Sequence, residues 1–167
     1  GRLTCTTDHA DAAGAHVHFV CVGTPQKADS PAADLTQVHG AIDALTPVLG
    51  PGALVVGKST VPVGTAAGIA DRVAETGARV AWNPEFLREG HAVEDTLRPD
   101  RLVFGVRDPQ DEAVPREVYA ALLDAGTPLL VTAFATAELV KVAANAFLAT
   151  KISFINAMAE VCEATGG

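Results

Sequence analysis

Short apolar runs rich in β-branched residues alternate with segments of helical periodicity along most of the chain. They predict five strands, at residues 18–22, 54–57, 79–81, 102–105 and 128–131. Because these runs are almost continuously apolar, each strand is expected to be covered on both faces, as in parallel sheets. The resulting pattern, β-α-β-α-β-β-α-β, predicts an open α/β fold with a parallel sheet.

Three shorter helices are expected between these strands. The first has Asp34 as its candidate N-cap, and its apolar stripe consists of Leu35, Val38, Ile42 and Leu45. A second helix should follow Gly64, with Ile69 and Val73 on its apolar face. A third is expected within 110–123, where Pro115 should delay its start or kink it.

The last segment predicts a much longer helix. Residues 136–163 contain neither Gly nor Pro over 28 positions, which corresponds to about 42 Å of α-helix, and Gly166 is a suitable stop. Such a helix is unusual as a simple βα crossover and indicates a bridge into a second, helical domain. The chain starts without methionine and contains only Met158, so we expect an internal piece of a longer protein, with that second domain missing or short.

Composition excludes several classes of protein. Hydrophobic residues make up 49% of the chain and charged residues 19%, which favours a packed core over disorder. A net charge of −8 offers nucleic acid no basic surface, and no apolar run approaches the roughly 20 residues of a membrane span. The three cysteines lack CxxC spacing, so neither a disulfide framework nor a metal site is expected, and the cytoplasm is the expected compartment.

Three loops that follow predicted strands combine small or hydroxyl residues with a proline. They are Gly23-Thr24-Pro25, the segment 58–62 with Ser59 and Thr60, and the segment 83–90. Ligands of open parallel sheets bind outside the carboxyl ends of the strands, so Thr24, Thr60 and Glu85 are expected to converge on one crevice. Each loop taken alone could be an ordinary turn.

Two pairs of polar residues, each spaced four positions apart, are further candidates for the functional site. Glu85 and Glu89 would share one face if their loop closes as a helical turn, and the apolar neighbours of Glu85 should partly desolvate it. Lys141 and Asn145 lie one turn apart on the long helix among apolar residues, where they suit oxyanion stabilisation and proton handling. The alternative is a solvent-facing Lys–Asn pair.

Five ordered blocks resemble the NAD-binding half of the UDP-glucose 6-dehydrogenases, in the UDP-glucose/GDP-mannose dehydrogenase family. The blocks are VGTP at 22–25, KSTVPVGT at 58–65, NPEFLREG at 83–90, PDR at 99–101 and TAELVKVAANAFLA at 136–149, continued by KISFIN at 151–156. The resemblance implies a Rossmann-like NAD-binding domain over 1–131 and the start of a central helical dimerisation domain over 132–167. It also implies a homodimer formed through the long helix.

The same resemblance implies oxidation of UDP-glucose to UDP-glucuronate with NAD as cofactor, through two hydride transfers and a cysteine-bound thiohemiacetal and thioester. Thr60 and Glu85 would hold the catalytic water, Glu85 as general acid/base, while Lys141 and Asn145 would stabilise the oxyanion. The cofactor would be bound by Gly23, Thr24, Pro25, Ser59, Thr60 and Glu89. The sugar nucleotide would be bound by Glu85, Phe86, Leu87, Arg88, Lys141 and Asn145.

Two parts of the family pattern are not found in these residues, namely the Gly-rich first βα turn and the nucleophilic cysteine with its Gly-x-Cys-Phe-Pro-Lys-Asp surroundings. Cys162 is expected to pack near the helix end and Cys21 within a strand, so the chain alone should be inactive. The alternatives are a dehydrogenase acting on GDP-mannose or a UDP-N-acetylhexosamine, a 3-hydroxyacid dehydrogenase, and a non-catalytic nucleotide-binding or dimerisation module.

Overall fold

The computed structural model describes residues 3–167, and it contains one five-stranded sheet in the order β1-β2-β3-β4-β5. The strands are β1 (Val17–Val20), β2 (Leu54–Gly57), β3 (Arg79–Trp82), β4 (Leu102–Val106) and β5 (Leu129–Ala133). All five predicted strands are therefore confirmed, with small differences at their ends. Gly1 and Arg2, the first residues of the expected NAD-binding domain, lie outside the described residues.

The sheet is mixed, so the expectation of an entirely parallel sheet is wrong at one pair of strands. β1, β2 and β3 are parallel, and so are β4 and β5, but β3 and β4 are antiparallel. The segment 83–101 joins β3 to β4 and contains only the short helix α3 (Ala92–Leu97), so the chain does not cross back over the sheet between these strands. β4 starts at the sheet edge where β3 ends, and an antiparallel neighbour needs no crossover.

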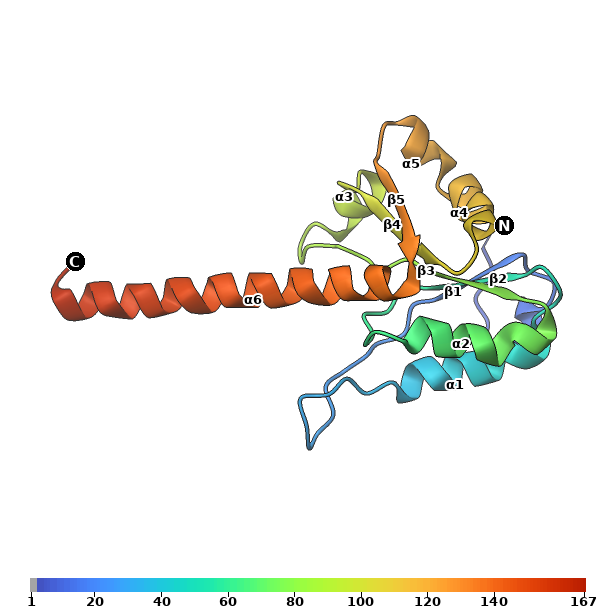
Figure 1. The fold of residues 1–167 in the computed structure, drawn as a ribbon, viewed down its shortest axis with the longest axis horizontal. Coiled ribbons are helices and arrows are strands. Elements are labelled where there is room, and N and C mark those ends of the chain that lie inside the picture. Colours follow the sequence, from blue (N-terminus) through green and yellow to red (C-terminus); the bar gives the residue numbers. More distant parts are fainter. Residues whose placement is uncertain (1–2) are drawn as a thin grey trace.

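Helices cover both faces of the sheet (Figure 1). The α-helices below and above it are α1 (Thr36–Leu45), α2 (Thr65–Val73), α4 (Ala113–Val118) and α5 (Ala120–Asp124), and the 3₁₀ turns are His9–Ala12, Thr46–Val48, Ala74–Thr76 and Pro109–Glu112. One core lies between the sheet and α1 and α2, and includes Ile42, Ile69 and Val80. A second core, which includes Phe104, lies on the α4 and α5 face.

The helix ends follow local chemistry. Asp34 accepts the backbone N–H of Thr36 at 2.9 Å. The N-cap position of α1 is nevertheless Leu35, so the prediction of Asp34 as N-cap is wrong by one residue. The expected third helix is divided at Tyr119, between α4 and α5, and not at Pro115. Pro115 is the third residue of α4, where its missing N–H has no partner within the helix.

The long helix α6 (Phe134–Thr165) contains 32 residues and ends at Gly166, which adopts the left-handed conformation with φ 79°. Only its first two turns pack on the body, where Phe134, Ala137, Glu138 and Lys141 are buried. The rest projects away from the sheet (Figure 1) and is exposed from Val142 onward. Residue 105 must be glycine for this close packing, because a Cβ there would lie 2.7 Å from the Ala137 Cβ.

The expectation that Cys21 and Cys162 pack is wrong for the described residues, whereas the absence of a membrane partner stays a prediction. By length and composition α6 is apolar enough to cross a membrane, although the sequence shows no long uninterrupted apolar run. Its polar residues are spread thinly among alanines, so the average over the helix is high without such a run. Cys21 and Cys162 are both exposed, because β1 ends at Val20 and because the described chain provides nothing to cover the end of α6.

Candidate functional site

The loops that follow β1 and β2 are joined by hydrogen bonds at the carboxyl edge of the sheet. The Thr24 hydroxyl donates to the backbone oxygen of Thr60 at 2.8 Å. The Ser59 hydroxyl donates to the backbone oxygen of Val22 at 2.6 Å. Thr24 and Thr60 are half-buried, whereas Ser59 is buried. These contacts fix the spacing of two backbone segments at the edge where a nucleotide would bind.

The loops that follow β2 and β3 are joined in turn through Asn83. Its side-chain oxygen accepts hydrogen bonds from the Lys58 ammonium at 2.8 Å and from the Tyr119 hydroxyl at 2.9 Å. Burial lowers the pKa of Lys58, although the nearby Cys21 and Glu85 oppose this shift. Burial also raises the pKa of Tyr119. The loops after β1, β2 and β3 therefore lie at one edge of the sheet. The convergence of Thr24, Thr60 and Glu85 on one crevice stays a prediction, because neither threonine lines the cavity beside Glu85.

A buried lysine from α6 meets this edge of the sheet. The Lys141 ammonium lies 3.1 Å from the Glu85 carboxylate, and 8% of the Lys141 side chain is exposed against 36% for Glu85. The second oxygen of Glu85 accepts the backbone N–H of Leu87 at 2.6 Å. The ammonium also lies 5.4 Å from the centre of the Phe86 ring. The alternative of a solvent-facing Lys141 is therefore excluded in this structure.

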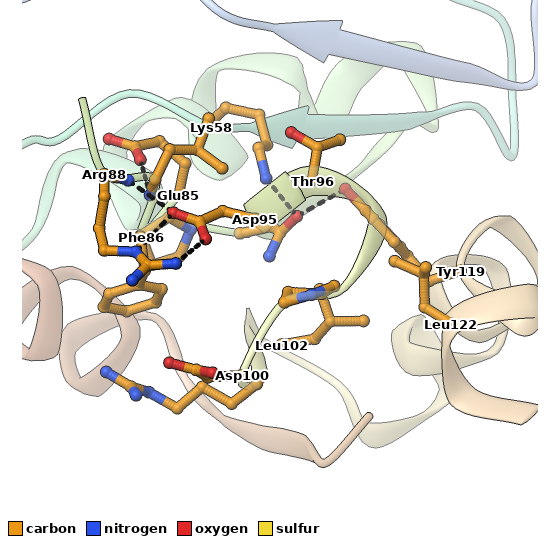
Figure 2. A pocket seen from close by; sticks show the side chains of 15 residues that line it. Lys58, Glu85, Phe86, Arg88, Asp95, Thr96, Asp100, Leu102, Tyr119 and Leu122 are labelled. Carbon is orange, nitrogen blue, oxygen red and sulfur yellow. Dashed lines mark hydrogen bonds and ion pairs between the residues drawn. The ribbon is translucent and has the colours of Figure 1, made fainter. Parts of the chain in front are cut away.

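A small cavity of about 220 Å³ opens beside Glu85 (Figure 2). One wall is the segment 83–88, and Arg88 is fixed there by Asp95, which accepts its backbone N–H at 2.8 Å and its guanidinium at 2.6 and 3.1 Å. These bonds lower the pKa of Asp95 to about 2. Pockets that enclose a ligand are typically about 300–1,000 Å³, so this cavity holds part of a nucleotide sugar at most.

The structure divides the predicted site residues into two groups. Those packed together are Thr24, Ser59, Thr60, Glu85, Phe86, Leu87, Arg88 and Lys141. Leu87 and Arg88 are nevertheless exposed, and so are the residues outside this group, namely Gly23, Pro25, Glu89 and Asn145. Asn145 lies one turn beyond Lys141, at the point where α6 leaves the sheet, so the described chain leaves it open to solvent.

The family of the chain follows from its match to two family models. Residues 1–123 match the NAD binding domain of the UDP-glucose/GDP-mannose dehydrogenase family, and residues 135–167 match the central domain of the same family. The chain belongs to this family. The strand order and the position of Lys141 on the helix that leads into the central domain agree with that assignment.

Several proteins with similar sequences and structures are named as sugar-nucleotide dehydrogenases. The UDP-glucose 6-dehydrogenase of Rickettsia felis is 48% identical over 151 residues, which are 89% of this chain and 34% of that protein. A UDP-glucose dehydrogenase structure from Pyrobaculum islandicum superposes with a TM-score of 0.80 at 42% identity, over 92% of this chain and 37% of that one. A GDP-mannose dehydrogenase from Pseudomonas aeruginosa gives 0.81 at 29% identity, over 90% and 36%. The chain thus spans about a third of the length of these relatives.

The carboxyl edge of β1 and β2 has open backbone within the segment that matches the NAD binding domain. The exposed backbone of Gly23 lies next to Thr24 in the loop after β1, and the Thr24 hydroxyl bonds the backbone of Thr60 in the loop after β2. No side chain crowds Gly23, since a Cβ there would meet only the Gln37 side-chain oxygen at 3.6 Å. Small, open backbone of this kind suits a dinucleotide. The hydroxyls of Ser59 and Thr24 are less suited to donate to a cofactor, because they already donate to the backbone oxygens of Val22 and Thr60.

Sequence reasoning missed several residues that shape the site. Lys58 and Asn83 stand directly after β2 and β3 inside quoted motifs, so their position was the available signal. Tyr119 reaches Asn83 across 36 positions of sequence, and Glu138 reaches the start of α2 across 72 to 74 positions. Pairings at such separations leave no trace in a local pattern.

Proposed function

We propose that the chain is the NAD-binding region, residues 1–131, and the first helix of the central dimerisation domain, residues 132–167, of an enzyme that oxidises UDP-glucose to UDP-glucuronate. The observation that carries this proposal is the buried Lys141, held 3.1 Å from Glu85 at the nucleotide-binding edge of the sheet. A buried cation beside a carboxylate in an open cavity is typical of a site that handles developing charge and protons.

Each packed site residue has a role that follows from its position. Glu85 would take up and return a proton, because it lies at the cavity and its carboxylate is held by Lys141 and by the backbone of Leu87. Lys141 would stabilise the negative oxygen that forms as the alcohol is oxidised. Thr60 would hold a water molecule with Glu85. Asn145 would complete the oxyanion site once further chain covers it.

The cofactor of this reaction would be NAD, which accepts hydride when it is bound. Gly23, Thr24, Pro25 and Thr60 would hold it at the ends of β1 and β2, with Glu89 approaching from the neighbouring loop and Ser59 fixing the loop beneath it. Phe86, Leu87 and Arg88 would contact the sugar nucleotide, and Asp95 keeps the Arg88 guanidinium beside the cavity.

The choice of sugar nucleotide rests on sequence similarity. The relative from Rickettsia felis at 48% identity is a UDP-glucose 6-dehydrogenase, whereas the GDP-mannose dehydrogenase structure shares 29% identity. UDP-glucose is therefore the first substrate to test, with GDP-mannose and a UDP-N-acetylhexosamine as the competing ones. A non-catalytic module is disfavoured, because such a module has no need of a buried Lys141 facing Glu85.

The exposed part of α6 supports a homodimer. Its large apolar side chains stand in solvent, and they include Phe147, Leu148, Ile152, Phe154, Ile155 and Met158. A soluble protein rarely leaves so extended an apolar surface uncovered. Covering it with protein accounts for its apolar character without a membrane. The enzyme would then work as a dimer in a bacterial cytoplasm, where its product supplies polysaccharide synthesis.

The test uses the complete protein that contains this segment. Purified enzyme is incubated with NAD⁺ and each of UDP-glucose, GDP-mannose and UDP-N-acetylglucosamine, and NADH is followed by absorbance. Two NADH per UDP-glucose and the highest kcat/KM for that sugar are expected. Faster oxidation of another sugar nucleotide would reassign the substrate. Absence of oxidation with all three would contradict the enzymatic proposal.

A further inference from the structure

Glu138 is a buried carboxylate that joins the long helix to the neighbouring helix α2. Only 1% of this residue is exposed. One of its carboxylate oxygens accepts the backbone N–H of Gly64 at 2.8 Å, and the other accepts that of Ala66 at 2.7 Å. Burial of a carboxylate is costly unless its oxygens are hydrogen-bonded. These two bonds provide that compensation.

Helix α2 depends on this distant contact because its own sequence supplies no cap. The residue at its N-cap position is Gly64, which has φ 99° and no side chain, so no local side chain bonds the first N–H groups. The first N–H groups of a helix have no partner within it. Glu138 satisfies two donors at this end, and a negative group there is also favoured by the helix dipole.

The segment fixed in this way includes the Thr60 loop. It runs from Lys58, bonded to Asn83, through Thr60, whose backbone oxygen accepts from Thr24, to Gly64. The loop is therefore anchored at its start by the sheet and at its end by α6.

The same turn of α6 carries the catalytic candidate of the proposed site. Glu138 and Lys141 are three positions apart, hence on one side of the helix, and both are buried. Glu138 faces the start of α2, while Lys141 reaches Glu85. Rotation or sliding of α6 that moved Lys141 would break the contacts of Glu138 as well. The two side chains together fix α6 relative to both loops.

We propose that Glu138 is a positioning residue, which sets the distance between Lys141 and the Thr60 loop by bonding the start of α2. This inference rests on the proposed function for its catalytic consequence, but not for its structural one. Displacement of a catalytic group by about 1 Å can cost about 100-fold in rate. Loss of the Glu138 bonds should therefore lower kcat more than it changes KM.

The experiment compares Glu138→Gln with Ile42→Val in the complete protein. Gln keeps the size of the side chain but replaces one acceptor oxygen with a donor NH₂ group. Ile42 is buried on α1 and lies outside the site, so Ile42→Val provides a matched loss of stability. We expect Glu138→Gln to speed amide hydrogen exchange in residues 58–66, to raise the rate of acetylation of Lys141, and to lower kcat about tenfold or more with KM within about threefold. Ile42→Val should change none of these beyond its effect on Tm.

The outcomes separate the two proposals. If wild-type enzyme oxidises no sugar nucleotide, the proposed function fails, and hydrogen exchange with Lys141 labelling still tests Glu138. Unchanged exchange and labelling in Glu138→Gln, or an unchanged kcat in an active enzyme, would overturn the positioning role. If Glu138→Gln does not fold, Glu138→Asp keeps the carboxylate but shortens its reach. The same changes in exchange, labelling and kcat are expected there, and their absence would equally overturn the proposal.

Discussion

At the scale of single residues, the site contains a few buried charged groups, and each of them needs a partner. Lys141 and Glu138 are the buried charges of α6, and each has its own partners, Glu85 for the first and backbone N–H groups for the second. Lys58 is partly buried near Glu85, and burial lowers its pKa. Replacing any of these groups changes both the packing and the local charge, so isosteric or matched variants are needed.

Lys141→Ala in the complete enzyme should lower kcat by about 100-fold or more, corresponding to about 3 kcal/mol of lost transition-state stabilisation. A fixed cation in a site with little water acts mainly on charge that develops during oxidation. Steady-state kinetics with UDP-glucose and NAD⁺ measure this, and Asn145→Ala should show a smaller loss of the same kind. Lys151→Ala, exposed on the same helix, is the control. A large rise in KM with unchanged kcat would make Lys141 a substrate anchor instead.

The Arg88–Asp95 contact should give a defined dependence on pH. The folded-state pKa of Asp95 is lowered from 3.8 to about 2, mainly by hydrogen bonds from Arg88. The stabilisation is therefore fully present above the unfolded pKa and is lost as pH falls through about 2. Carbon-detected NMR titration of the Asp95 carboxyl should show this midpoint. A midpoint near 3.8 would mean that the contact does not form in solution.

At the scale of elements, close approach to the backbone of two glycines decides where a ring and a helix lie. Gly57 makes room for the Trp82 ring, because a Cβ at residue 57 would lie 2.1 Å from a ring carbon. Gly105 does the same for α6, whose Phe134 Cα would lie 2.9 Å from such a Cβ. The backbone of α6 cannot yield as a flexible side chain would, so Gly105 fixes how closely this helix approaches β4.

Gly105→Ala should destabilise the protein by about 1–3 kcal/mol through overpacking against α6. The matched control is Gly40→Ala on α1, where nothing lies within 4 Å of the added Cβ and the backbone is helical. That control should raise stability by about 0.4–1 kcal/mol. Urea unfolding of both variants, followed by circular dichroism, measures the difference. Equal stability of the two variants would contradict the close packing of α6 on β4.

At the scale of the whole molecule, the chain consists of a packed α/β body and the helix α6. The body covers only the first two turns of α6. The first two turns of α6 belong to the core of the body, while the remainder stands in solvent with its large apolar side chains exposed. This distribution supports the proposal that other protein covers the projecting part of α6.

Complete enzyme should sediment as a dimer at micromolar concentration, because burial of the apolar α6 surface stabilises association. Ile155→Glu, on the exposed part of α6, should shift it towards monomer. Val93→Glu, equally apolar and exposed but on α3, should leave the dimer intact. Sedimentation velocity measures all three. A monomeric wild type would contradict the dimer.

The sequence by itself determined the five strands, the two helices that cover one face and the long final helix, because periodicity and glycine or proline positions act locally. The sequence also indicated Glu85 and Lys141 as candidate catalytic residues, because of their apolar neighbours and their resemblance to the family pattern. Tertiary structure alone decided that β4 runs antiparallel to β3, that Asn83 joins Lys58 to Tyr119, and that Glu138 caps α2. These features depend on packing between segments far apart in the chain, and such packing leaves no periodic signal in the sequence.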